Sequence, residues 1–253
     1  MEQMIKVQIE GKEYEYPAGT TYQTIAGDFQ KEYEDDILLV LFDHRLRELG
    51  KSLKSEGTIE FITAKQDPGK KAYRRITTLL LQKAVDNLYG KDGVSIQIRH
   101  SLGQGYYCTL KGAKEDISDL ILSIKIEMMR LVDADISIGK KSMHDKERLF
   151  RYRRSSRVNV YDLDGYIDYF YGYMVPSTGY LKWFDLIPFE EGMMLLFPGK
   201  NTKTIDEFHP SKKLFHTLQE SEEWGKMLNI DTVGALDDAI AAGKMRQVIM
   251  VQE

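Results

Sequence analysis

Histidine and cysteine, which often carry out acid–base or metal chemistry, are few in this chain and widely spaced. It has 253 residues with one cysteine and five histidines, and no histidine stands four positions from another: His44, His100, His144, His209 and His216. Two imidazoles four apart on a helix would share one face and could reach one metal ion or one substrate. A lone thiol such as Cys108, on an expected strand, is typical of a small core hydrophobe. The sequence therefore predicts no catalytic residue and no metal ligand.

Two short stretches resemble phosphate-binding loops but lack necessary residues. Gly50-Lys51-Ser52 is similar to the end of a P-loop, yet Arg45 stands where the first glycine is required. Gly103-Gln104-Gly105 lacks the third glycine of a dinucleotide fingerprint, because Cys108 occupies that position. We expect no nucleoside triphosphate site and no cofactor in this chain.

Basic residues are concentrated locally, although the formal net charge is −4. One dense segment spans 140–157, and a second group is Lys70, Lys71, Arg74 and Arg75. Such runs are typical of a solvated helix face, but they could also contact phosphates. The candidates for polyanion binding share the denser segment: Lys140, Lys141, Arg151, Arg153, Arg154 and Arg157.

Aromatic residues crowd the segment from Tyr166 to Tyr173, and Trp183 follows soon after. Such a run either builds a core or offers faces on which a base can stack. The stacking candidates are Tyr169, Tyr171 and Tyr173.

Composition bounds the class of protein. Hydrophobic residues make up 42% and charged residues 29%, as in ordinary globular proteins. One cysteine excludes an internal disulfide, and no apolar stretch approaches the length of a membrane span. We therefore expect a cytoplasmic protein with no membrane partner.

The first 64 residues predict a small closed unit. Residues 4–9 alternate apolar and polar positions, and Gly11 turns the chain into a second strand at 12–17. Thr20 or Thr21 can cap a helix, a continuous apolar strand follows at 37–42, and another strand covers 58–62. This order of elements is that of a β-grasp fold.

Motifs within this unit resemble a known family. They are Tyr16-Pro17-Ala18-Gly19-Thr20-Thr21, Ile25-Ala26, Leu46-Arg47-Glu48-Leu49 and Gly57-Thr58-Ile59. They are similar to the TGS domain of threonyl-tRNA synthetases, stringent-response enzymes and some GTPases. The resemblance implies ligand or RNA contact and regulation, with no catalysis.

The remaining chain predicts an α+β arrangement. We expect a long amphipathic helix at 72–89 packed on an antiparallel sheet, a strand at 94–98, its hairpin partner at 106–110 and a helix at 117–131. Further expected elements are a strand at 135–138, a helix at 142–151, strands within 158–197, helices at 211–229 and 233–242, and a strand at 247–251. The predicted division is 1–64, a linker at 65–71 containing Pro68 and Gly69, an α+β domain at 72–200, and a helical extension at 201–253.

The segment from Tyr166 to Gly179, together with Gly105-Tyr106-Tyr107-Cys108, resembles the second additional domain, the editing module of threonyl- and alanyl-tRNA synthetases. It keeps the whole turn Val175-Pro176-Ser177-Thr178-Gly179 of the threonyl enzymes. In that family a His-x-x-x-His pair and a Cys-x-x-x-His pair build the hydrolytic site. The aligned positions here hold Arg75, Leu79, Phe170 and Met174. The resemblance therefore implies an editing-like fold whose hydrolytic site has been lost.

Later motifs resemble another family. Residues 180–186, Lys213-Leu214-Phe215 and Trp224-Gly225 are similar to bacterial uridine-kinase-like nucleoside kinases, which carry both units ahead of a P-loop kinase domain. This resemblance implies that the chain's own kinase domain, with ATP and Mg²⁺, would follow residue 253.

Two functions remain from the sequence. The first is a non-catalytic regulatory or ligand-binding region of a nucleoside kinase, whose parent transfers phosphate from ATP to uridine or a similar nucleoside. The alternative is a stand-alone RNA- or tRNA-binding relative of the editing module. The expected ligand is a small nucleotide or tRNA, and a residual hydrolase is a weaker third interpretation.

Overall fold

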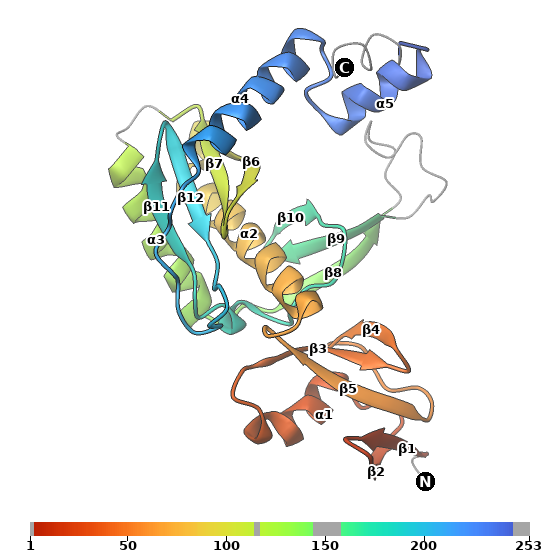
Figure 1. Cartoon of the computed structure of the whole chain (residues 1–253). Helices are drawn as coiled ribbons and strands as arrows, with labels where there is room; N and C mark the ends of the chain where they lie inside the picture. The colour runs from red at the N-terminus through yellow and green to blue at the C-terminus, as the bar shows by residue number, and fades with distance from the viewer. Residues whose placement is uncertain (1–2, 114–116, 144–157, 245–253) are drawn as a thin grey trace.

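The computed structural model describes residues 3–113, 117–143 and 158–244. Its fold is α+β, with antiparallel sheets and one long helix, α2, near the centre (Figure 1). The five-stranded sheet and α1 form a first unit at one end, and the remaining strands lie around α2 in a second unit, with α3 at its outer edge. The sequence prediction of the α+β class is confirmed.

The first unit is a mixed sheet with one helix against it. Its strands are β1 (Met4–Ile9), β2 (Lys12–Pro17), β3 (Ile37–Phe42), β4 (Arg45–Glu48) and β5 (Gly57–Thr63), in the order β2-β1-β5-β3-β4. β1 and β5 are parallel neighbours, and the other pairs are antiparallel. The hairpin, predicted from alternation, and the strand predicted from a continuous apolar run are both confirmed.

Helix α1 (Tyr22–Phe29) begins after Thr21, whose side chain accepts a hydrogen bond from the backbone N–H of Thr24. This contact satisfies one of the amide groups that a helix start leaves unpaired. Ile25 and Phe29 are buried against the sheet beside Val7 and Ile59. The short 3₁₀ turn η1 (Gln30–Glu32) then leads towards β3.

Helix α2 (Asp67–Tyr89) begins earlier than the predicted Ala72. Pro68 and Gly69, which were interpreted as linker breakers, lie within its first turn. Proline is accepted there because the first amides of a helix have no intrahelical partner. The predicted linker is therefore mostly helical, and α2 follows β5 closely. A 3₁₀ turn, η2 (Gly90–Asp92), comes after it.

A four-stranded antiparallel sheet flanks α2. Its strands are β6 (Ser95–Leu102), β7 (Gly105–Lys111), β11 (Asp185–Phe189) and β12 (Gly192–Leu196), in the order β11-β12-β7-β6. Helix α3 (Ile117–Asp133) contacts both α2 and β11. The predicted packing of a long helix on an antiparallel sheet is confirmed.

A second, three-stranded sheet contains β8 (Ile138–Met143), β9 (Val158–Leu163) and β10 (Tyr166–Tyr169), in the order β10-β9-β8. The predicted strand at 135–138 is thus placed too early. Ser142 and Met143 belong to β8, so a helix starting at residue 142 is wrong at these two positions. The rest of that predicted helix, and the predicted strand at 247–251, lie outside the described residues.

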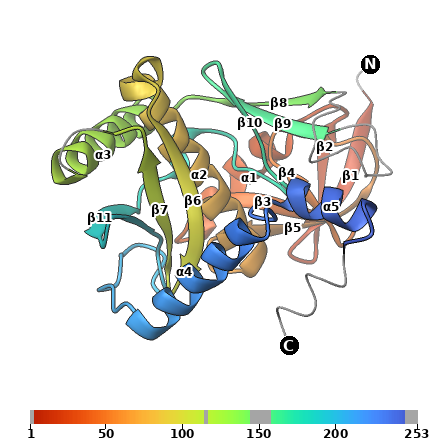
Figure 2. The same cartoon turned by 90° about the horizontal axis from the view of Figure 1, so that it is seen from above.

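Helices α4 (Lys212–Met227) and α5 (Val233–Ala241) confirm the two helices predicted near the C-terminus. Seen from above, α4 runs beside β6 and α5 extends beyond it (Figure 2). Within the part of the chain that the structure describes, no helix has both the length and the apolar character needed to cross a membrane.

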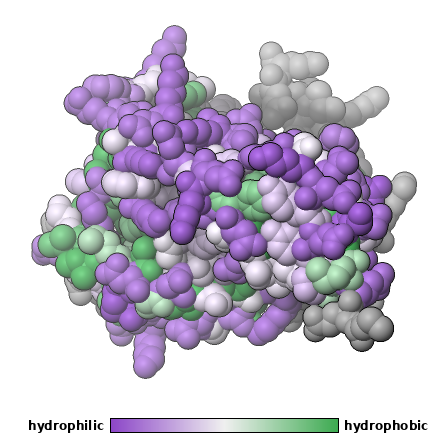
Figure 3. Space-filling view, turned by 90° about the horizontal axis from the view of Figure 1, so that it is seen from below, coloured by the Kyte–Doolittle hydropathy of each residue, from purple (hydrophilic) through white to green (hydrophobic). Residues whose placement is uncertain are grey.

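The two units have separate cores that meet at the first sheet. Ile37 and Val40 of β3 join the core under α1, whereas Leu38 and Leu39 join the larger core around α2. A register shift between Ile37 and Leu39 accompanies this division. Viewed from below, the outer surface is covered mainly by hydrophilic residues (Figure 3). Strand β3 is therefore buried on both sides, against α1 and against the larger core around α2.

Candidate ligand-binding junction

The positions aligned with a hydrolytic site are filled by packing. Leu79 of α2 is 0% exposed and Met174 is 2% exposed, and both belong to the larger core. Phe170 is partly buried against the same core. None of these three side chains can transfer a proton at neutral pH, and a thioether is a weak ligand for zinc.

Arg75, the fourth of these positions, is used structurally. Its Nη1 donates a hydrogen bond to the carbonyl oxygen of Tyr173 at 3.2 Å. Gly172 has φ +130, and a Cβ on it would lie 2.4 Å from the guanidinium carbon of Arg75. The guanidinium therefore lies directly against the backbone of the 172–173 segment.

Glu48 joins the first unit to the second. Its carboxylate accepts hydrogen bonds from Lys140 Nζ at 3.0 and 3.1 Å, Tyr161 Oη at 2.6 Å and the Met174 backbone N–H at 3.2 Å. The Glu48 side chain is 12% exposed, so it depends on these donors to replace water. One carboxylate thus holds three segments of the second unit against β4.

The phenol of Tyr161 lies within hydrogen-bond distance of two acceptors in this cluster. Its oxygen lies 2.6 Å from a Glu48 oxygen and 2.6 Å from the carbonyl oxygen of Gly172, and its single proton can be donated to only one at a time. Burial, followed by the hydrogen bond and charge of Glu48, raises the pKa of Tyr161 well above its ordinary value. The phenol therefore stays a neutral donor.

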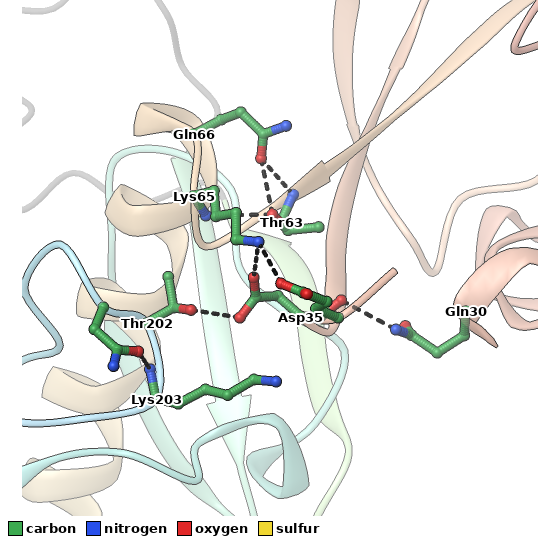
Figure 4. Close-up of polar contacts among 9 residues, drawn as sticks. Gln30, Asp35, Thr63, Lys65, Gln66, Thr202 and Lys203 are labelled. Atoms are coloured by element: carbon green, nitrogen blue, oxygen red, sulfur yellow. Dashed lines mark hydrogen bonds and ion pairs between the residues drawn. The ribbon is translucent and has the colours of Figure 1, made fainter. Parts of the chain in front are cut away.

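A second polar cluster, centred on Asp35, also connects the first unit with the second (Figure 4). Asp35 is 7% exposed, accepts a short hydrogen bond from Thr202 Oγ1, and pairs with Lys65 Nζ at 3.3 Å. The side chain of Gln30 donates to the backbone oxygen of Asp35 at 3.0 Å and also accepts from the backbone N–H of Ile37. The segment after β12 is thereby held against the first unit.

Beside the Glu48 cluster is a pocket of about 340 Å³. Four cationic side chains line it: Arg47, Lys51, Lys54 and Lys140. Lys140 pairs with Glu48, the only acidic residue among the lining residues. Arg47, Lys51 and Lys54 make no ion pair with any carboxylate of the described residues. The pocket therefore carries positive charge that the described chain does not neutralise.

Aromatic and hydroxyl groups complete the pocket. Phe42 and Tyr173 are partly exposed, whereas Tyr22 is 3% exposed and supports Phe42 with ring centroids 5.8 Å apart. Lys140 Nζ lies 5.7 Å from the ring centroid of Tyr173. Ser52 and Ser55 supply hydroxyls. The lining is typical of a site for an anion with an attached flat group.

The loop that carries Lys51 and Lys54 is held by backbone contacts. The N–H groups of Tyr22 and Gln23, at the start of α1, donate to the carbonyl oxygens of Lys51 and Leu49 at 2.9 and 2.8 Å. The Leu53 N–H donates to the Thr20 oxygen at 2.8 Å. The pocket wall is thus organised in advance of any ligand.

Comparison with known proteins gives one consistent similarity. The chain is 25% identical over 193 residues to the threonine–tRNA ligase of Oceanobacillus iheyensis, covering 70% of this chain and 30% of that protein. It is 27% identical over 198 residues to that of Thermotoga maritima, covering 72% and 30%, and 24% identical over 202 residues to threonine–tRNA ligase 2 of Bacillus subtilis, covering 74% and 31%. No family model matches.

Most of this chain is a threonyl-tRNA synthetase-like region. It spans about 30% of the length of the curated relatives that it matches. The similarity agrees with the sequence resemblance on which the positions Arg75, Leu79, Phe170 and Met174 were aligned. The similarity does not test what those four positions do, so their role is inferred from their packing.

The predicted polyanion residues are only partly described. Lys140 pairs with Glu48, and Lys141 pairs with Asp162 at 2.5 Å. Arg151, Arg153, Arg154 and Arg157 lie outside the described residues, so their role remains a prediction. Of the stacking candidates, Tyr173 lines the pocket, Tyr171 is 78% exposed, and Tyr169 packs against Val160.

Cys108 is buried on β7, and burial raises its pKa to about 12, which makes the thiol unreactive. Among the described residues, no three metal-ligating side chains gather in one place.

Sequence reasoning missed the residues that build the junction. Glu48, Tyr161, Arg47, Lys51 and Lys54 were not singled out as site residues. A signal existed in the closely spaced cations at positions 45, 47, 51 and 54. The P-loop pattern concerns only the glycines of this stretch, and its failure leaves the local positive charge unexplained.

Proposed function

We propose that this chain is a non-catalytic RNA-binding region, related to the amino-terminal part of threonyl-tRNA synthetases, and that its RNA ligand is tRNA. The observation that carries this proposal is the pocket between the units. Arg47, Lys51 and Lys54 face it without a carboxylate partner among the described residues. Cations left unpaired at one concave surface are suited to phosphates.

The packing of the aligned positions supports the absence of hydrolysis. Leu79 and Met174 are core residues, and Arg75 is bound to a backbone carbonyl. A positioned general base normally contributes about 100- to 10,000-fold in rate, and none of the four aligned side chains offers one. We infer that the fold and the ligand class were kept while the chemistry was lost.

The proposal assigns a domain type to each part of the chain. We assign residues 1–64 to a β-grasp unit of the TGS type, which the packing of α1 on a sheet of order β2-β1-β5-β3-β4 supports. Residues 72–200 would form the editing-like domain and 201–253 the extension. A purely regulatory region of a nucleoside kinase remains the competing interpretation. The relatives named above are ligases, and they support the RNA-binding function over it.

tRNA binding tests the proposal directly. We expect the chain to bind deacylated tRNA with an affinity that falls as salt rises. Replacing Arg47, Lys51 and Lys54 together by alanine should reduce the salt slope by roughly one unit for each lost phosphate contact. The matched control replaces three exposed lysines outside the pocket, Lys12, Lys31 and Lys91, by alanine.

Equal effects of the two triple variants would locate binding elsewhere, and the absence of any tRNA binding would overturn the function. Hydrolysis is measured separately with seryl-tRNA. We expect release of serine at the spontaneous rate, whereas turnover above that rate would refute the assignment as non-catalytic.

A further inference from the structure

We propose that the pocket between the two units is a site for a single nucleotide, with the phosphate on the Lys51–Lys54 loop and the base against Phe42 and Tyr173. The inference rests on the proposed function, because it names the part of an RNA, or the free nucleoside phosphate, that the site would take. It also stands apart from that function, because a free nucleotide could bind whether or not tRNA does.

The size of the pocket fits one nucleotide. Its volume of about 340 Å³ is near the lower end of ligand sites, which range over about 300–1,000 Å³. A duplex or a folded RNA could therefore insert only one unpaired residue. The rest of a longer strand would have to run over the surface.

The charges of the two walls differ. The first-unit wall carries Lys51 and Lys54 on a loop fixed by the start of α1, with Arg47 beside them on β4. At the second-unit wall Lys140 is paired with Glu48 of β4, and these two charges offset each other. A phosphate is therefore attracted to the first wall and gains little at the second. Ser52 and Ser55 can add hydroxyl donors on the loop side.

The Glu48 carboxylate can accept a hydrogen bond from the sugar or the base of the nucleotide. Its Oε1 accepts from Lys140, Tyr161 and Met174, whereas its Oε2 has one hydrogen bond, from Lys140. A carboxylate oxygen has room for a further donor. A ribose hydroxyl or an exocyclic amine is such a donor, and a phosphate oxygen is not.

The aromatic residues give the base a platform. Phe42 is supported by the buried ring of Tyr22, and Tyr173 is placed by the Arg75 hydrogen bond to its carbonyl oxygen. Stacking on such rings is tolerant of base identity. We therefore expect similar binding of nucleotides with different bases.

Calorimetric titration of the whole chain tests the inference with four probes: adenosine 5′-monophosphate, adenosine, ribose 5-phosphate and inorganic phosphate. The nucleotide should bind most tightly. The double variant Lys51→Ala/Lys54→Ala should weaken the nucleotide about 10-fold or more and leave adenosine unchanged. Phe42→Leu and Tyr173→Leu should each weaken the nucleotide and adenosine by about 5-fold or more and spare ribose 5-phosphate. Lys12→Ala should change nothing.

The outcomes separate the inference from the proposed function. Inorganic phosphate binding as tightly as the nucleotide would reduce the site to an anion site and overturn the inference. So would nucleotide binding that is insensitive to Phe42 and Tyr173. tRNA binding by a chain that binds no free nucleotide would refute the inference and leave the RNA-binding function standing. Nucleotide binding with the expected variant pattern, but without tRNA binding, would support the inference and refute the function.

Discussion

At the scale of single residues, Glu48 makes the connection on which the junction depends. Its carboxylate is nearly buried and meets a lysine, a phenol and a backbone amide from three segments of the second unit. Removing one partner of a buried charged network usually costs more than the network contributes, since the remaining groups are left without water or partner.

We expect Glu48→Gln to lower the free energy of unfolding by about 1–3 kcal/mol, because Lys140 loses its counter-charge and an amide can accept at only one atom. Urea denaturation measures the change. Glu13→Gln is the control, since Glu13 pairs with Lys6 at 57% and 52% exposure and should change stability by less than about 1 kcal/mol. Equal effects of the two substitutions would mean that the Glu48 cluster contributes no more to stability than an exposed ion pair does.

Gly172 provides a second test at this scale. We expect Gly172→Ala to lower the melting temperature more than Gly165→Ala does. Both positions have positive φ, +130 and +84, but a Cβ at Gly172 would meet the guanidinium of Arg75 and one at Gly165 meets nothing within 4 Å. In addition, φ near +130 is almost closed to alanine. Similar losses would show that the Arg75 contact does not constrain the segment.

Phenols with a raised pKa, Tyr16 and Tyr33 among them, give the chain a pH dependence on the alkaline side. Burial, then a hydrogen bond to Asp28, raises the pKa of Tyr16 to about 12 from 10.0, and burial with Glu10 does the same for Tyr33. A folded-state pKa above the unfolded value stabilises the fold below pH 10, and that stability is lost as pH rises from 10 through 12. We expect a steep fall in stability in this window, followed by circular dichroism, and a shallower fall for Tyr16→Phe/Tyr33→Phe. The same slope in both proteins would contradict the assignment.

At the scale of elements, the sequence predicted those helices and strands that a local pattern of residues determines. The alternation at 4–9 and the apolar run at 37–42 gave strands with the observed bounds. The first has the period of the pleat, and the second is a short, continuous apolar run typical of a buried strand. The start of α2 was misplaced because Pro68 and Gly69 were interpreted as breakers, whereas the first helical turn tolerates them. Ser142 and Met143 were predicted as helix but pair with β9, a non-local contact that their own sequence does not indicate.

Helix α4 depends on one buried anchor. Phe215 is 1% exposed and packs edge-on against Tyr107 and Phe189, while Trp224 on the same helix is 55% exposed. We expect Phe215→Ala to increase hydrogen exchange throughout α4 and Trp224→Ala to leave it unchanged, because only the first removes buried contacts. Unchanged protection in Phe215→Ala would indicate that other contacts, such as the ion pair between Glu222 and Arg99 at 2.6 Å, are sufficient to hold the helix.

At the scale of the whole molecule, the candidate site could not be predicted because it lies between segments distant in sequence. Lys140 and Glu48 are 92 positions apart, and Tyr161 and Glu48 are 113 apart. The four positions proposed to have lost hydrolytic residues were aligned from a resemblance to a known family, which requires only the sequence. Three cations of the pocket, Arg47, Lys51 and Lys54, are close in sequence, but only the packing of the two units brings Lys140 and Tyr173 to the same concavity.

The shared sheet also predicts how the molecule unfolds. Because β3 contributes Leu38 to the core around α2 and Val40 to the core under α1, neither unit can lose its structure without exposing part of the other. We expect one cooperative transition. In a Trp224→Phe background, Trp183 alone reports the second unit, and Tyr73 of α2 holds it through hydrogen bonds of 2.8 and 2.9 Å.

In that background, Val7→Ala, a change confined to the first core, should shift the Trp183 fluorescence midpoint as far as it shifts the circular dichroism midpoint. Leu38→Ala should do the same, with a loss of about 2–5 kcal/mol. A Trp183 midpoint that follows Leu38→Ala but ignores Val7→Ala would mean that the two units unfold independently. The pocket would then lie between bodies that can separate, and a nucleotide bound there should restore the coupling by adding contacts to both walls.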